Sequence, residues 1–300
     1  MEYAEFIKSK SQDIRPICIE SYSDNSDLFG FQNDIVRWAL QNGMAGIFAD
    51  CGFGKTIMQL EWSRNIPGNV LILAPLAVSY QTKQEGFKFG IDVNQCRTHD
   101  DVKQGINITN YEMLKNFDVS YFDGIVLDES SILKSLTGKI RNEIITAFKS
   151  TKYRLACTAT PSPNDFMELG NHSEFLGRMS MQEMLAMFFV HDGGETQKWR
   201  LKGHAKDSFW DWLSSFCCMI KKPSDLGYDD GDFVLPDIEI EQHTVEAGGV
   251  PDGFLFPVEA LTLQERQRER KATIKQRAER CADLANHDRP MLIWCNLNDE

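Results

Sequence analysis

The chain of 300 residues is predicted to fold as an α/β protein, with a mostly parallel β-sheet covered by helices on both faces. Two observations predict this class. Short apolar runs typical of buried strands alternate with segments whose apolar residues recur at helical spacing. A glycine-containing loop also joins one such run directly to a helical pattern, as parallel strand–loop–helix units require. The apolar runs are 46–48, 70–74, 106–109, 124–127 and 153–157.

The helical patterns follow in chain order. The first helix is expected within residues 28–40, because apolar residues recur there at helical spacing from Ile35 onward. Further helices are expected over 57–62, around 77–88 and around 138–149. A later apolar stripe at helical spacing indicates one more helix packed on a core. Its members are Phe209, Trp212, Leu213, Phe216, Cys217 and Ile220.

Composition indicates a globular protein of one large or two medium domains, since 42% of residues are hydrophobic and 11% are aromatic. Eight scattered cysteines without C-x-x-C spacing are typical of a reduced protein with no zinc site or disulfide framework. The polar amino end does not resemble a secretory signal. The longest apolar run, 70–78, contains Pro75 and is too short to span a bilayer. We therefore expect no membrane partner and a cytoplasmic location.

Charge is distributed unevenly. The net charge of −12 disfavours a nucleic-acid partner, but residues 223–246 hold eight Asp and Glu residues and no Lys or Arg. That segment accounts for −8 of the −12, so the remaining chain carries only −4 and leaves room for basic surfaces.

The loop between the strand at 46–48 and the next helix has the composition of a phosphate-binding loop. Gly52 and Gly54, on either side of Phe53, let successive backbone N–H groups turn toward an anion, and the following helix adds its positive amino end. Lys55 can reach the outer phosphates, and the Thr56 hydroxyl can ligate the magnesium that accompanies a nucleotide. Ala49 stands where the strict pattern has glycine. The alternative is an ordinary glycine turn with a solvated lysine.

Two later strands end in polar residues. The run at 124–127 is followed by Asp128 and Glu129, which suit magnesium binding through water and activation of an attacking water. The run at 153–157 is followed by Thr158, Ala159 and Thr160, whose hydroxyls can hydrogen-bond those carboxylates. Solvated acids and a Thr/Pro turn are the alternatives for each stretch alone. Their order on one sheet favours a common site, because parallel strands bind ligands at their carboxyl ends.

These stretches resemble motifs I, II and III of superfamily 2 helicases and translocases. The resemblance is greatest to DEAD/DEAH-box proteins of the Snf-type group, particularly phage and prophage versions, although Ser131 replaces the last residue of the usual second motif. It implies a RecA-like ATP-binding domain in which Gln32 reads adenine, Lys55 and Glu129 are catalytic, and 158–160 couple the lobes. It also implies ATP and Mg²⁺ as ligands, with Thr56 and Asp128 at the metal. Residues implied to touch nucleic acid are Pro75, Thr109 and Asn110.

Gln32 has a competing interpretation from its position alone. A glutamine at the start of a helix can bond the backbone there instead of an adenine edge.

The resemblance also divides the chain. Residues 1–27 are expected to be an extension, 28–170 the RecA-like ATP-binding domain, and 171–232 a helical connector that leads into a second lobe at 233–300. In that lobe we expect a charged helix at 264–280 and a first strand at 291–296. Since no candidate for the second-lobe arginines follows residue 296, the lobe is expected to be incomplete and the sequence truncated.

The predicted function is an ATP-dependent helicase or translocase whose partner is nucleic acid, with DNA favoured over RNA. Two alternatives stay open: a non-catalytic ATP-binding scaffold, and another P-loop NTPase that acts on a small metabolite.

Overall fold

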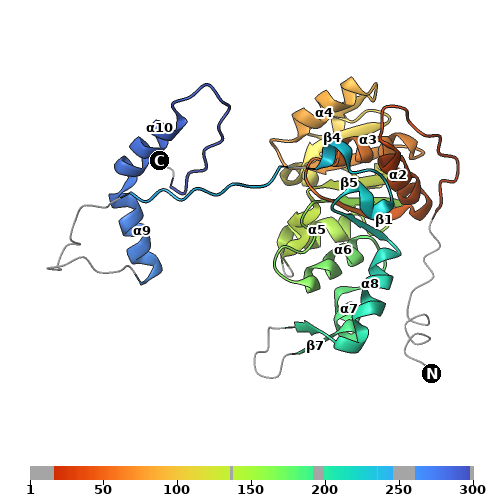
Figure 1. Ribbon diagram of the computed structural model, residues 1–300. Coiled ribbons are helices and arrows are strands. Elements are labelled where there is room, and N and C mark those ends of the chain that lie inside the picture. The colour runs from red at the N-terminus through yellow and green to blue at the C-terminus, as the bar shows by residue number, and fades with distance from the viewer. Residues whose placement is uncertain (1–16, 136–137, 192–198, 235, 246–260, 298–300) are drawn as a thin grey trace. The chain divides into compact units, whose positions relative to one another are not determined.

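The structure is a computed structural model that describes residues 17–135, 138–191, 199–234, 236–245 and 261–297 (Figure 1). The chain forms two compact units, Met1–Leu235 and Pro236–Glu300. The boundary between the two units falls after Leu235.

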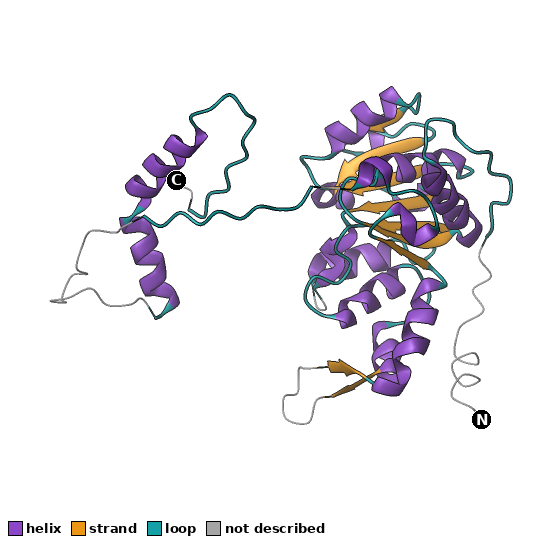
Figure 2. Ribbon diagram, in the orientation of Figure 1, coloured by secondary structure: helices purple, strands orange, loops and turns teal. Residues whose placement is uncertain are grey.

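A parallel sheet is the centre of the first unit (Figure 2). It has seven strands in the order β3-β4-β2-β5-β6-β1-β9. Every neighbouring pair in it is parallel, so all seven carboxyl ends lie at one rim. The strands are β1 Met44–Ala49, β2 Val70–Ala74, β3 Val93–Gln95, β4 Ile106–Asn110, β5 Gly124–Asp128, β6 Tyr153–Cys157 and β9 Cys217–Ile220.

Helices cover both faces of this sheet, as predicted (Figure 1). The central strands are buried along their whole length because side chains on alternate residues enter two separate cores. Ile72 and Val126 join the core under α2 and α3, whereas Leu71 and Ile125 join the core under α5 to α8. The helices are α2 Gly30–Asn42, α3 Lys55–Asn65, α4 Ser79–Lys88, α5 Lys139–Ala147, α6 Leu169–Phe175, α7 Met181–Phe188 and α8 Lys206–Ser214.

The connector predicted as helical at 171–232 contains strands as well, which corrects that expectation. Its helix α8 ends at Ser214, and Cys217–Ile220 forms the edge strand β9 beside β1. The stripe from Phe209 to Ile220 therefore spans a helix and a strand. A second correction is a two-stranded antiparallel hairpin, β7 Phe189–His191 with β8 Trp199–Leu201. Strands of three or four residues are too short to show a clear alternation of apolar and polar residues, so they could not be recognised beside the helical spacing.

The described part of the predicted extension, 17–27, packs on the core. The Ile19 N–H donates to the Leu40 carbonyl (3.2 Å), and the Tyr22 hydroxyl donates to Asn33 Oδ1 (2.6 Å). Asn25 Nδ2 donates to the buried Glu61 carboxylate at 2.8 Å. These contacts tie the segment to α2 and α3.

The second unit contains two helices, α9 Leu263–Ala272 and α10 Ile274–Ala285. The single charged helix predicted at 264–280 is therefore broken at Thr273. The strand predicted at 291–296 is wrong, because 291–295 has no regular secondary structure. None of the described residues from 236 to 297 is buried, so this apolar stretch has neither a neighbouring strand nor a core to hold it extended. Within the described chain, no helix is long and apolar enough to cross a bilayer.

Candidate nucleotide site

Three adjacent strands bring the predicted site residues to one rim of the sheet. The glycine loop follows β1, Asp128 ends β5, and Thr158 follows β6, which lies between them. The register pairs Cys157 with both Ile47 and Asp128, which sets the three strand ends level. Residues far apart in sequence thus meet at the carboxyl end of a parallel sheet, where ligands of such sheets bind.

The loop itself is curled by its glycines. Gly52 and Gly54 have φ values of 85° and 73°, in the left-handed region that L side chains rarely adopt. A Cβ added to Gly54 would lie 2.5 Å from Gln32 Nε2, so a side chain there would also have to displace this amide. Helix α3 begins at Lys55, and its free N–H groups follow the loop directly.

Lys55 turns back over the start of the loop. Its Nζ donates to the carbonyls of Ala49 (2.9 Å) and Asp50 (3.0 Å). Its charge also lowers the pKa of Asp128, in the direction opposite to the effect of burial. Phosphate oxygens bound by the loop would compete with the two carbonyls for this amine. Thr56, the second residue of α3, is half-buried next to it.

Asp128 is a buried carboxyl, only 5% exposed. Burial, and then repulsion from Glu129, raise its pKa to about 6, against the opposing effects of the Gln59 amide and Lys55. A divalent cation would reverse this penalty, because it stabilises the ionised carboxylate. Mg²⁺ takes one or two protein oxygens and completes its shell with water and phosphate, so Asp128 and Thr56 suit it. Among the described residues, no cluster of three or more His, Cys, Asp and Glu suggests another metal site.

Glu129 is held in an unusual conformation. Among the described residues it is the one non-glycine position with positive φ (54°). Thr158 Oγ1 donates to its Oε2 at 3.2 Å, and the Thr160 N–H donates to Thr158 Oγ1 at 3.1 Å. The hydroxyl stretch predicted to contact the carboxylates therefore does so, through Thr158, with Ala159 half-buried between the two threonines.

Three buried residues that the sequence analysis did not select surround the acids. Ser130 Oγ lies 3.1 Å from His172 Nε2 on α6, and burial lowers the pKa of His172 to about 4, so this imidazole is neutral at pH 7. The Tyr111 hydroxyl donates to the Asp128 carbonyl at 2.7 Å. These contacts come from chain positions 17 and 42 residues away, and no local pattern marks them.

Gln32 lies beside the loop, and both ends of its amide bond backbone groups. Its Oε1 accepts from the Phe29 N–H (3.0 Å), and its Nε2 donates to the Phe53 carbonyl (2.9 Å). This is the arrangement of the alternative interpretation, a residue at a helix start that bonds the backbone. The predicted adenine contact stays a prediction.

The residues predicted to touch nucleic acid lie farther along the same rim. Thr109 and Asn110 line a hollow of about 510 Å³, and Leu76 lines it next to Pro75. The Thr109 hydroxyl is buried without a hydrogen-bond partner among the described residues. Asn110 Oδ1 accepts from the Met113 N–H at 3.1 Å and so begins the 3₁₀ helix at Tyr111–Asn116. The exposed Arg97 is a further wall of this hollow.

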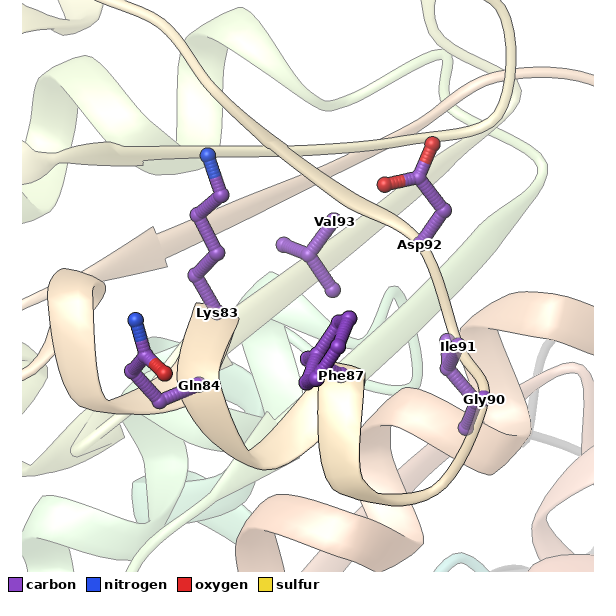
Figure 3. A pocket seen from close by; sticks show the side chains of 7 residues that line it. All are labelled: Lys83, Gln84, Phe87, Gly90, Ile91, Asp92 and Val93. Atoms are coloured by element: carbon purple, nitrogen blue, oxygen red, sulfur yellow. The ribbon is translucent and has the colours of Figure 1, made fainter.

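A separate hollow of about 460 Å³ lies between α4 and the chain leading into β3 (Figure 3). Lys83, Gln84 and Phe87 project from α4, and residues 90–93 form the other wall. None of the predicted site residues lines it.

Comparison with known proteins agrees with this fold. Scans against family models and curated proteins find no match. Among solved structures, the chain is similar to the SWI2/SNF2 ATPase core of Sulfolobus solfataricus in complex with dsDNA, with a TM-score of 0.53 and 21% identity over 73% of this chain and 48% of that one. It thus spans about half the length of that ATPase core.

Two further structures match at lower similarity. The UvsW helicase of bacteriophage T4 gives a TM-score of 0.43 and 15% identity over 59% of this chain and 64% of that one. The Hef helicase domain of Pyrococcus furiosus gives 0.41 and 16% over 49% and 36%.

The parallel sheet, the helices on both of its faces and the likeness to the SNF2 core define the first unit as RecA-like in fold.

Proposed function

We propose that this chain is the ATP-binding part of an ATP-dependent helicase or translocase that acts on nucleic acid, with DNA as the partner. One observation carries the proposal: the Lys55 amine, the buried Asp128 and the Glu129–Thr158 pair meet at a single rim of a RecA-like sheet. An ordinary glycine turn would not place a lysine and two carboxylates together at the carboxyl ends of adjacent strands.

In this proposal each residue has a defined task. The N–H groups around Gly52 and Gly54 and the Lys55 amine bind the phosphates, and Thr56 and Asp128 hold Mg²⁺, which neutralises charge on the transferring phosphate. Glu129 accepts a proton from the attacking water. Thr158 holds the Glu129 carboxylate, so movement of the 158–160 stretch alters the position of the base.

Thr109, Asn110 and Pro75 are proposed to contact the nucleic-acid backbone. The hollow lined by Thr109, Asn110 and Arg97 shares the rim with the nucleotide residues, and hydroxyl, amide and guanidinium groups are ones that bind phosphate oxygens. The SNF2 core of similar fold was solved in complex with dsDNA, which makes duplex DNA the first partner to test.

The test is ATP binding and hydrolysis by this chain, with and without Mg²⁺, and with duplex DNA, single-stranded DNA or RNA added. We expect Mg²⁺-dependent ATP binding and a weak turnover that DNA raises more than RNA does. ATP binding with a turnover that no nucleic acid raises would support the scaffold alternative. Failure to bind ATP would contradict the proposal altogether.

A further inference from the structure

The acidic segment ahead of the boundary between the two units is folded by its own carboxylates. We call residues 223–234 the acidic turn. Asp230 accepts from the Ser224 N–H (2.8 Å) and hydroxyl (3.0 Å), and Asp229 Oδ1 accepts from the Gly231 N–H (2.8 Å). The Phe233 N–H donates to the Asp230 carbonyl at 2.8 Å. These acids therefore shape a turn that presents Phe233.

Phe233 packs against the nucleotide loop. Its ring stacks on that of Phe53, with centroids 5.3 Å apart and planes at 28°. It also meets the edges of Phe29 and Phe31, each at 5.2 Å. Offset stacking and edge contacts at these distances are favourable aromatic geometries, and they add to the burial of apolar area.

Phe53 is well placed to transmit this contact to the loop. It lies between the two left-handed glycines Gly52 and Gly54, and it is only 5% exposed. Gln32 Nε2 donates to the Phe53 carbonyl at 2.9 Å. Because flexible glycines flank it, the position of the Phe53 ring and the curl of the loop depend on each other.

A second contact attaches the acidic turn to α2. The Tyr228 hydroxyl donates to the Asp34 carboxylate, and the Tyr228 ring lies 6.3 Å from that of Phe31. At Gly30 an added Cβ would lie 2.7 Å from the Tyr228 ring, so the absence of a side chain at this position leaves room for the ring. Two residues of the turn, Tyr228 and Phe233, thus lie against the helix that precedes the nucleotide loop.

We propose that Phe233 is a positioning residue for the nucleotide loop: its ring holds Phe53, and thereby the loop, in the curled form that binds a nucleoside triphosphate. The inference rests on the proposed function. Phe233 precedes the boundary at 235/236 by two residues, so the chain leaving the first unit is anchored on the loop. By thermodynamic linkage, the factor by which the docked Phe233 raises nucleotide affinity equals the factor by which bound nucleotide favours the docked turn.

The experiment measures the dissociation constant of a fluorescent ATP analogue with Mg²⁺ for the wild type and for Phe233→Ala. Losing the aromatic contacts should weaken binding by about 3- to 10-fold. Phe233→Trp, which keeps a ring, should bind within about twofold of the wild type, since one stacking partner replaces another. Phe87→Ala is the matched control, because Phe87 is 84% exposed and lies on α4 away from the loop.

Amide hydrogen exchange on the wild type tests the reciprocal effect and does not depend on how well Phe233→Ala folds. Added ATP analogue should slow exchange in 223–234 by about the same factor of 3 to 10. Unchanged exchange there, or unchanged affinity in Phe233→Ala while Lys55→Ala loses binding, would overturn the Phe233 inference and leave the nucleotide site intact. A wild type that binds no analogue would overturn both.

Discussion

The two halves of the sheet rim are built differently. At the ends of β1, β6 and β5, charged groups are fixed by internal contacts: Lys55 on two loop carbonyls, Glu129 on Thr158, and Asp128 under burial. At the ends of β4 and β2 lies the hollow of Thr109 and Asn110, where the Thr109 hydroxyl has no partner among the described residues.

The difference indicates how each half would work. Catalysis requires charged groups that are already in position before the reaction, because preorganised charges need no rearrangement in the transition state. Binding of a flexible polymer backbone instead needs exposed polar side chains along a surface, such as Arg97 at the wall of this hollow. Changes in the first half should therefore have large effects on turnover, and changes in the second half small effects on affinity.

The largest expected effect comes from the proposed general base. Glu129→Gln should lower ATP turnover by about 10²- to 10⁴-fold while ATP stays bound, because the amide cannot take a proton from water. Steady-state hydrolysis and analogue binding measure the two quantities. Glu143→Gln, an exposed change on α5, is the control and should leave both unchanged. Near-normal, nucleic-acid-stimulated hydrolysis by Glu129→Gln would defeat the assignment.

Lys55→Ala should remove the amine that bridges the loop and the phosphates. We expect turnover to fall by about 10²- to 10³-fold, as for loss of one preorganised charge, together with weaker ATP binding. The exposed Lys83→Ala on α4 is the matched control. If Lys55→Ala and Lys83→Ala have the same turnover, Lys55 has no special role, and the proposed difference between the two halves of the rim is contradicted.

Asp128 should show its buried charge in a pH profile. Its pKa is raised to about 6 in the folded protein from the ordinary 3.8, so the folded state binds more protons than the unfolded state between those values. This carboxyl therefore costs stability as pH rises from 4 to 6. Without Mg²⁺, the free energy of unfolding of Asp128→Asn should therefore rise relative to that of the wild type by about 1–3 kcal/mol between pH 4 and pH 7.

Denaturant unfolding at a series of pH values, with Mg²⁺ chelated, measures this difference. A difference between Asp128→Asn and the wild type that stays constant from pH 4 to pH 7 would contradict the raised pKa. Chelation should also abolish turnover, because Mg²⁺ neutralises the transferring phosphate in the proposed reaction.

The smallest effect is expected in the outer half. Arg97→Ala should weaken duplex DNA binding a few-fold and reduce the slope of log affinity against log salt by about 0.9, the value for one phosphate contact. ATP affinity should not change. DNA titrations at several salt concentrations test this, with the exposed Lys88→Ala on α4 as a control of equal charge. An unchanged salt slope would mean that the hollow does not face the backbone.

Much of this comparison was predictable from sequence. The five central strands, the loop and the helix after it were recognisable because each combines a local apolar period with glycine or polar punctuation. The burial of Asp128 follows from its place at the end of a strand that is apolar throughout. The sequence analysis missed β3, β7, β8 and β9 and wrongly expected a strand at 291–296, because runs of three to six residues carry no periodicity that separates strand, helix and loop.

The amino-acid sequence by itself determined the α/β class, the curled loop and the polar residues at the strand ends, since these depend on propensity and pattern within about ten residues. Only the tertiary structure decided which side chains meet. The Ser130–His172 contact, the Tyr111 hydroxyl on Asp128 and the Phe233 ring on Phe53 join residues 42, 17 and 180 positions apart. Parallel sheets bring distant strand ends together, and a linear pattern holds no record of which ends become neighbours.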